Sequence, residues 1–100
     1  MRLTKRQASV IKQTIIRFFG EDALIFLFGS RIDDDKRGGD IDLYVECPSL
    51  TADDLVDAKI SALVELKKEL GEQKIDLLVN TGEGPSLPIF EIARQQGISL

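Results

Sequence analysis

The stretch "ALIFLFGSRIDDDKRGGDIDLYVE", residues 23–46, contains two apolar segments joined by a polar, glycine-containing connection. Its first part, residues 23–28, is a continuous apolar run ended by Gly29, which is typical of a strand buried on both faces. From Asp40 onward, apolar and polar residues alternate strictly, and this alternation predicts a half-buried strand over residues 40–46. The polar residues are therefore concentrated where the first strand ends and the second begins.

Two helices are predicted from capping signals and from apolar residues at helical spacing. Thr4 followed by Gln7 has the pattern of a capping box, and Gly20 offers the end of this first helix. Thr51 is expected to cap a second helix that ends before Gly71. The apolar side of the second helix is expected to consist of Leu55, Ile60, Leu63, Val64, Leu66 and Leu70.

The last third of the chain predicts one more strand and one short helix. "KIDLLVN", residues 74–80, is an apolar strand whose one acid is Asp76. A loop with prolines and glycines leads to the helix "IFEIARQQ", residues 89–96, which Gly97 closes. No linker or internal repeat interrupts this order, so we expect a single domain over residues 1–100 with an α/β (α+β) fold.

The composition narrows the classes of function. A net charge of −4 argues against a general nucleic-acid binder, because such proteins neutralise phosphates with clustered Lys and Arg. The sequence has no histidine, which excludes histidine-based catalysis and histidine-ligated zinc. The single cysteine, Cys47, is interpreted as a small packing residue at a strand end. Without a signal sequence or a long apolar run, the chain is expected to be cytoplasmic and to bind no membrane.

Three aspartates are candidate metal ligands. Asp40 and Asp42 are two residues apart on a predicted strand, so their side chains share a face and can converge on one cation. Oxygen-only ligands favour Mg²⁺ over zinc or copper. Asp76 is the third candidate, since an acid in an apolar strand is rarely buried without a partner. If its strand lies beside the strand of Asp40, three carboxylates meet on one side of the sheet.

Gly29, Ser30 and Arg31 form a candidate phosphate-binding turn. Gly29 and Ser30 directly follow the first strand, where backbone N–H groups and the Ser30 hydroxyl can face an anion. Arg31 adds a positive charge suited to phosphate. Such a turn beside a carboxylate-held metal is the arrangement that phosphoryl transfer needs, with two metals binding the phosphates and activating a hydroxyl.

Some of these acids have a second interpretation. Asp33 to Asp35 are interpreted as the solvated tip of a connection between strands. An EF-hand loop beginning at Asp33 is excluded, because its twelfth position is Tyr44 instead of the bidentate Glu. Asp76 could instead be a capped acid or form a salt bridge with Lys74. The glycine turn and all three acids occur in order, each at a strand or strand end, and this combination favours a site for metal and nucleotide.

"GSRIDDDKRGGDIDL" followed by "KIDLLV" resembles the signature of the polymerase-beta-type nucleotidyltransferase superfamily. The chain is most similar to the minimal nucleotidyltransferases (MNT proteins) of bacteria and archaea, whose usual ending is similar to "PIFEIARQQGISL". The resemblance implies a polymerase-beta-like fold, with a small mixed β-sheet flanked by helices. It also implies transfer of a nucleoside monophosphate from ATP to a hydroxyl, with Mg²⁺, two ions, as cofactor.

The resemblance assigns roles to particular positions. It implies nucleotide binding by Gly29, Ser30 and Arg31, and both catalysis and metal binding by Asp40, Asp42 and Asp76. Asp76 would also be the base for the acceptor hydroxyl. The chain departs from the pattern in two ways: nine residues separate Ser30 from Asp40 where ten are common, and Gly39 stands where Ser is frequent. Neither departure removes a ligand.

The resemblance also implies a partner protein. MNT proteins are often encoded beside a helical HEPN-domain protein, and as antitoxins they add AMP to a tyrosine of that toxin, a ribonuclease. A domain of this length without an acceptor-binding domain fits this role. Two alternatives stay open. One is a non-catalytic binding module that neutralises its partner by contact, and the other is a nucleotidyltransferase for a small hydroxylated acceptor such as an aminoglycoside.

Overall fold

The computed structural model describes residues 3–29, 41–71, 74–82 and 87–100. Within these residues the chain forms a mixed α/β fold, and every predicted helix and strand is present. The elements, in chain order, are α1 (Lys5–Phe19), β1 (Leu24–Phe28), β2 (Ile41–Glu46), α2 (Ala52–Leu70), β3 (Ile75–Asn80), α3 (Pro88–Gln96) and β4 (Ile98–Ser99). The predicted fold class is confirmed, and β4 is a strand that the sequence did not predict.

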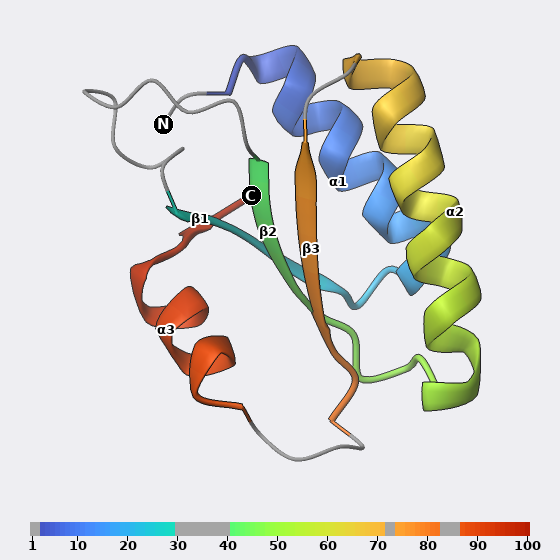
Figure 1. The fold of residues 1–100 in the computed structure, drawn as a ribbon, viewed down its shortest axis with the longest axis vertical. Helices are drawn as coiled ribbons and strands as arrows, with labels where there is room; N and C mark the ends of the chain where they lie inside the picture. The colour runs from blue at the N-terminus through green and yellow to red at the C-terminus, as the bar shows by residue number, and fades with distance from the viewer. Residues whose placement is uncertain (1–2, 30–40, 72–73, 83–86) are drawn as a thin grey trace.

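The strands form one mixed sheet in the order β3-β2-β1-β4 (Figure 1). β1 pairs antiparallel with both β2 and β4, whereas β2 and β3 run parallel. Helix α2 makes the crossover between the two parallel strands, as a parallel connection requires. The first residues of β2 and β3 therefore lie at the same end of the sheet, next to the last residues of β1.

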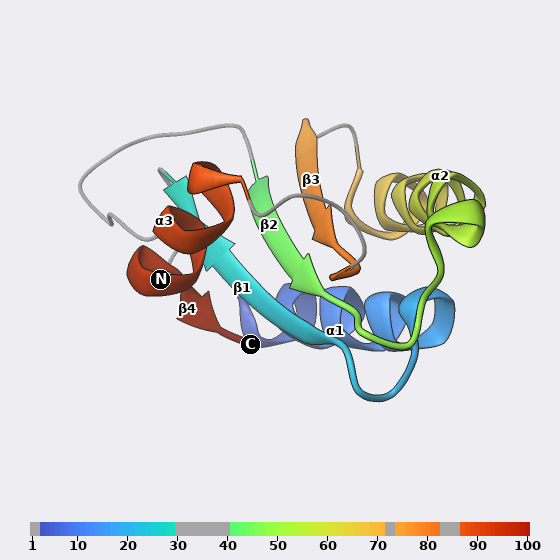
Figure 2. The same cartoon turned by 90° about the horizontal axis from the view of Figure 1, so that it is seen from below.

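Helices cover both faces of the sheet. Helices α1 and α2 pack on one face, and α3 packs on the other, over β1 and β2 (Figure 2). The core between the sheet and the helices α1 and α2 includes Ile11, Ile15, Leu27, Leu43 and Leu66, each with an exposed fraction of 0%. In the part of the chain that the structure describes, no helix has both the length and the apolar character to cross a membrane.

The predicted helix caps are confirmed in atomic detail. The Thr4 hydroxyl accepts a hydrogen bond from the Gln7 backbone N–H at 3.0 Å, and the Thr4 N–H donates to the Gln7 side chain at 2.9 Å. At the start of α2, the Thr51 hydroxyl accepts from the Asp54 backbone N–H at 3.3 Å. These bonds satisfy N–H groups that a helix start leaves without a partner. Local sequence thus fixes where both long helices begin.

Two expectations about strand burial were wrong. The first failed because α3 covers the second face of the sheet. Tyr44 was expected on the open face of a half-buried strand, yet its exposed fraction is 1%. Its ring stacks between Phe26 and Phe90, with centroid distances of 5.9 and 5.5 Å. β1 is not buried throughout either, since Leu24 at its beginning is 48% exposed.

The expected apolar side of α2 was wrong at two positions. Ile60 and Val64 are 56% and 61% exposed, whereas Ala62 and Leu66 are fully buried. Residues four apart share a helix face, and a shift of two residues reaches nearly the opposite face. Because α2 has apolar residues on both faces, periodicity alone could not identify the buried one.

Gly97 allows the chain to turn from α3 into β4. A Cβ at this position would lie 2.4 Å from the Ala93 carbonyl oxygen and 3.0 Å from the Phe26 Cβ, so only glycine fits. The chain then pairs Ile98 with Leu27 and Ser99 with Phe26. A strand of two residues is too short for an alternating pattern, which is why the sequence did not reveal it.

Candidate active site

Asp42 and Asp76 lie side by side on the parallel strands β2 and β3. The two residues are direct partners in the register, so their side chains project from the same face of the sheet. This is the α3 face, opposite the buried Ile41 and Leu43. Asp42 is half-buried and Asp76 is exposed, so the acid of β3 is open to solvent. The strand adjacency on which the predicted carboxylate cluster depends is present.

Gly29 packs directly against Asp42. Phe28, the last residue of β1, is paired with Asp42, so the chain leaves β1 beside that carboxylate. Gly29 has a φ of +79°, and a Cβ there would lie 2.2 Å from Asp42 Oδ2. Positive φ and close approach both require glycine. The start of the predicted phosphate turn and a candidate metal ligand therefore touch.

The other predicted site residues, Ser30, Arg31 and Asp40, lie outside the described residues, as do Asp33 to Asp35. Within the described ranges, no three acids, cysteines or histidines come together as a metal-binding group. The donor set that is placed, two neighbouring carboxylates, nevertheless suits Mg²⁺. That ion is usually held by one or two carboxylates together with waters and substrate phosphates.

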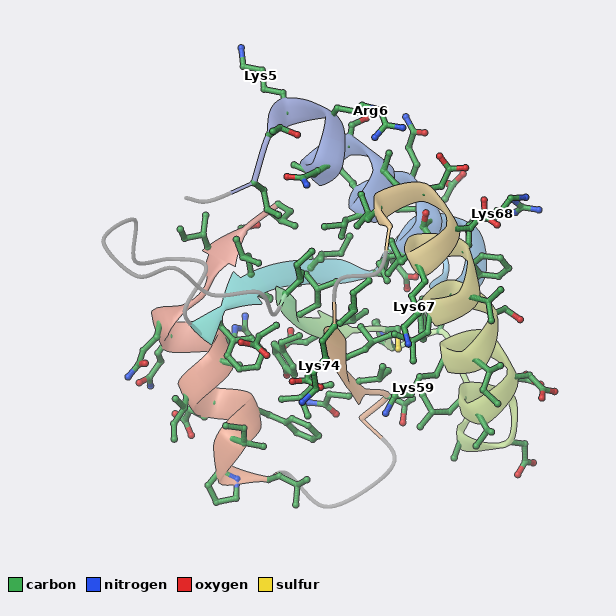
Figure 3. All side chains as sticks on the ribbon, turned by 45° about the horizontal axis from the view of Figure 1, so that its top comes forward. Lys5, Arg6, Lys59, Lys67, Lys68 and Lys74 are labelled. Carbon is green, nitrogen blue, oxygen red and sulfur yellow. The ribbon has the colours of Figure 1, made fainter. Side chains whose placement is uncertain are left out.

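A cavity of about 530 Å³ opens beside the two aspartates. Asp42 and Asp76 line it together with Lys59 and Leu63 of α2 and Ile89 of α3. Figure 3 shows Lys59 extending from α2 on the side of that helix nearer β3. The sequence did not identify these three residues as part of a site. The available signal was that Lys59 precedes Leu63, a predicted core residue, by one helical turn.

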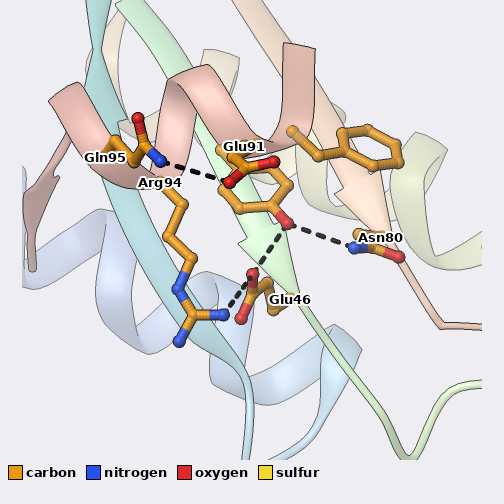
Figure 4. A pocket seen from close by; sticks show the side chains of 7 residues that line it. Glu46, Asn80, Glu91, Arg94 and Gln95 are labelled. Carbon is orange, nitrogen blue, oxygen red and sulfur yellow. Dashed lines mark hydrogen bonds and ion pairs between the residues drawn. The ribbon is translucent and has the colours of Figure 1, made fainter. Parts of the chain in front are cut away.

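A second cavity, of about 560 Å³, lies at the other end of β2 and β3 on the same face (Figure 4). Its polar side chains bind one another. The Tyr44 hydroxyl donates to Glu46 Oε2 at 2.8 Å and accepts from the Asn80 side-chain amide at 3.2 Å. Arg94 of α3 donates to the same Glu46 oxygen at 3.3 Å. Glu46 and Asn80 are register partners, so this network joins the ends of both strands to α3.

The environment of Tyr44 keeps its hydroxyl protonated. Burial raises the pKa of Tyr44, the hydrogen bond from Asn80 lowers it, and the nearby Glu46 carboxylate raises it further. The resulting pKa lies above the ordinary value of 10.0. Because the polar groups of this cavity are already paired, we interpret the network as structural.

Cys47 is buried and follows β2 directly. Burial, with a smaller contribution from Asp22, raises the pKa of the Cys47 thiol to about 11. The thiol lies 3.8 Å from the Asn80 carbonyl oxygen. At neutral pH it is protonated and therefore a poor nucleophile, which agrees with its interpretation as a packing residue.

Comparison with known proteins places these features in a family. Residues 9–96 match the family model described as nucleotidyltransferase domain. This segment contains Gly29, Asp42 and Asp76, and the observed mixed sheet with three helices in the described residues is consistent with a polymerase-beta-like nucleotidyltransferase fold. None of the curated proteins matches the chain.

Proposed function

Because this chain belongs to the nucleotidyltransferase domain family, we propose that it transfers AMP from ATP to a hydroxyl group of a partner protein. The observation that carries the proposal is the register pairing of Asp42 with Asp76, with Gly29 packed against Asp42. Two neighbouring carboxylates repel each other, and a bound cation removes this repulsion. The chemistry of these side chains thus supports a site for metal and triphosphate.

Each predicted residue has a role in the proposed reaction. Asp40, Asp42 and Asp76 hold Mg²⁺, which when bound neutralises charge on the triphosphate and favours ionisation of the attacking hydroxyl. Gly29 and Ser30 donate backbone N–H groups to the phosphates, and Arg31 adds a guanidinium. The acidic pair attracts cations and the turn attracts anions, so the two features together select a metal-bound nucleotide.

The proposed reaction forms one phosphorus–oxygen bond and breaks another. The acceptor hydroxyl oxygen attacks the α-phosphorus of ATP, and the bond from that phosphorus to the β-phosphate oxygen breaks. Pyrophosphate leaves with the electron pair of the broken bond. Asp76, the exposed acid of the pair, takes the hydroxyl proton.

The surroundings of the acids support a protein side chain as acceptor. The cavity beside Asp42 and Asp76 also has apolar walls formed by Leu63, Leu78 and Ile89. Such walls suit an aromatic ring better than a polar sugar. A tyrosine of a HEPN-type toxin would fit this cavity, and its modification would make the present chain the antitoxin of the pair.

The test is transfer of label from ATP that carries it on the α-phosphate. The chain is incubated with this ATP, Mg²⁺ and the protein product of the neighbouring gene, and labelled protein is separated by electrophoresis. We expect the partner to be labelled, and Asp42→Asn to slow labelling by at least about 100-fold. Asp57→Asn, which removes an exposed acid from α2, is the matched control and should label at the normal rate.

The same experiment separates the alternatives. No labelled partner with any nucleotide or divalent metal would overturn the proposal. If Asp42→Asn still neutralises the toxin in cells, the chain acts as a binding module. Label on an aminoglycoside, with none on the partner protein, would identify a small-molecule enzyme instead.

A further inference from the structure

Helix α2 exposes a stripe of large apolar side chains. Val56, Ile60 and Val64 are 62%, 56% and 61% exposed, and they succeed one another at intervals of four residues. At about 100° per residue, Ile60 lies roughly 160° around the helix from the buried Ala62. The stripe therefore occupies the side of α2 that faces away from the core, where polar residues are normal.

Charged residues extend this stripe at both ends. Asp53 lies three residues before Val56, and Lys67 lies three residues after Val64, so both belong to the same side of the helix. Both are exposed, and neither forms an ion pair with another residue of the described ranges. The pattern is symmetric about Ile60. Val56 and Val64 lie at equal distances from it along the helix, and so do Asp53 and Lys67, which carry opposite charges.

From this pattern we infer that α2 binds α2 of a second copy of the chain, antiparallel, across a two-fold axis at Ile60. In that arrangement Ile60 meets its own counterpart, and Val56 meets Val64 of the other copy. Asp53 then faces Lys67 of the other copy, twice in the dimer. A parallel pair would place Asp53 against Asp53 and Lys67 against Lys67, so charge complementarity selects the antiparallel pair.

The size of the helix also suits this contact. With 19 residues α2 is about 28 Å long, and the stripe together with the two charged residues at its ends extends over most of it. Burying three branched apolar side chains from each copy removes the largest exposed apolar group of this helix from water. The inference goes beyond the proposed function and does not depend on it, because it rests on residues that take no part in transfer.

Molecular mass in solution tests the contact. We expect sedimentation equilibrium over roughly 1 to 200 µM protein to give twice the chain mass of 11.1 kDa. Ile60→Asp places two carboxylates at the axis and should weaken dimerisation by at least about 100-fold. Ser61→Asp adds the same charge one residue away, off the stripe, and should leave the dimer intact.

A charge exchange tests the antiparallel orientation. Asp53→Lys alone places a lysine opposite Lys67 of the other copy at each end of the contact. The repulsion should weaken the dimer about tenfold. Combining it with Lys67→Asp restores opposite charges and should return the dissociation constant to within about threefold of the original. Circular dichroism of each variant checks that the fold is intact.

Three results would overturn the inference. The first is a monomer across the whole concentration range, which would mean that the stripe binds another molecule. The second is a dimer that Ile60→Asp does not weaken. The third is a charge exchange that does not restore association. None of these measurements uses nucleotide, so failure here is distinct from failure of the proposed transfer reaction.

Discussion

The two ends of the β2–β3 pair have the same register geometry and differ in the residue that faces the acid of β2. At one end, Asp42 and Asp76 are register partners, and at the other end Glu46 and Asn80 are, four residues later on the same face. Glu46 accepts hydrogen bonds from Tyr44 and Arg94, so its charge is offset within the fold. At the first end the acid of β2 faces a second acid, whereas Glu46 faces an amide.

This difference separates structural from functional polar residues. An acid paired with an amide and a cation stabilises the contact between α3 and the sheet. Asp76 instead faces a second acid and makes no ion pair among the described residues. An exposed acid that makes no ion pair of this kind and lines a cavity is expected to serve ligand binding.

Removing one acid from each end tests this comparison most severely. Asp76→Asn should reduce the rate of nucleotidyl transfer by at least about 100-fold and leave stability unchanged, because Asp76 is exposed and makes no ion pair among the described residues. Glu46→Gln should change the rate less than about twofold while lowering stability by about 1 kcal/mol. Transfer assays and urea unfolding of both variants measure this. Equal losses of activity would show that both ends take part in the reaction.

The close packing of Gly29 on Asp42 predicts a smaller effect at the acidic end. Gly29→Ala forces alanine to a φ of +79° and pushes the Asp42 carboxylate away, so transfer should fall on the order of 10- to 100-fold. Gly71→Ala is the matched control. Its φ is +89°, but no atom lies within 4 Å of the added Cβ.

Both glycine variants should lose about 1 to 2 kcal/mol of stability from backbone strain, and only Gly29→Ala should lose activity. Chemical denaturation and the transfer assay separate the two contributions. If Gly71→Ala impairs transfer to the same degree, then strain rather than the contact with Asp42 explains the loss.

The sequence predicts best where the cause is local. Thr4 and Thr51 cap their helices because a hydroxyl reaches an N–H three residues away, and that distance is fixed by helix geometry. The alternation around Asp42 likewise determines which side chains share a face of β2. The pairing of Asp42 with Asp76 required one further step, namely that the two strands are neighbours.

The sequence predicts poorly where the cause is tertiary. The burial of Tyr44 depends on α3, which follows it by more than forty residues and covers the face expected to be open. Lys59 joins the cavity of the acids only because α2 runs beside β3. Ile60 and Val64 of the exposed stripe on α2 were assigned to the core because apolar residues on two faces give no unique periodicity.

At the structural end, Tyr44→Phe should have the smallest effect. It removes a buried hydroxyl that bonds both Glu46 and Asn80, so stability at neutral pH should fall by about 1 kcal/mol with no change in transfer.

The pH dependence gives the sharper test, because the pKa of Tyr44 is raised in the folded chain, first by burial and then by Glu46. The contribution of the protonated hydroxyl is complete below the unfolded pKa of about 10 and is lost as pH rises through the folded value. Above that unfolded value the unfolded chain ionises first and binds fewer protons, so the wild type loses stability that the phenylalanine variant keeps. The stability difference between the two proteins, measured by urea unfolding, should therefore shrink as pH rises above about 10. Tyr44 is the single tyrosine of the chain, so tyrosinate absorbance reports its ionisation directly. A stability difference that stays constant through this range would mean that the hydroxyl titrates as it does in water, and that the network at this end of the sheet does not protect it.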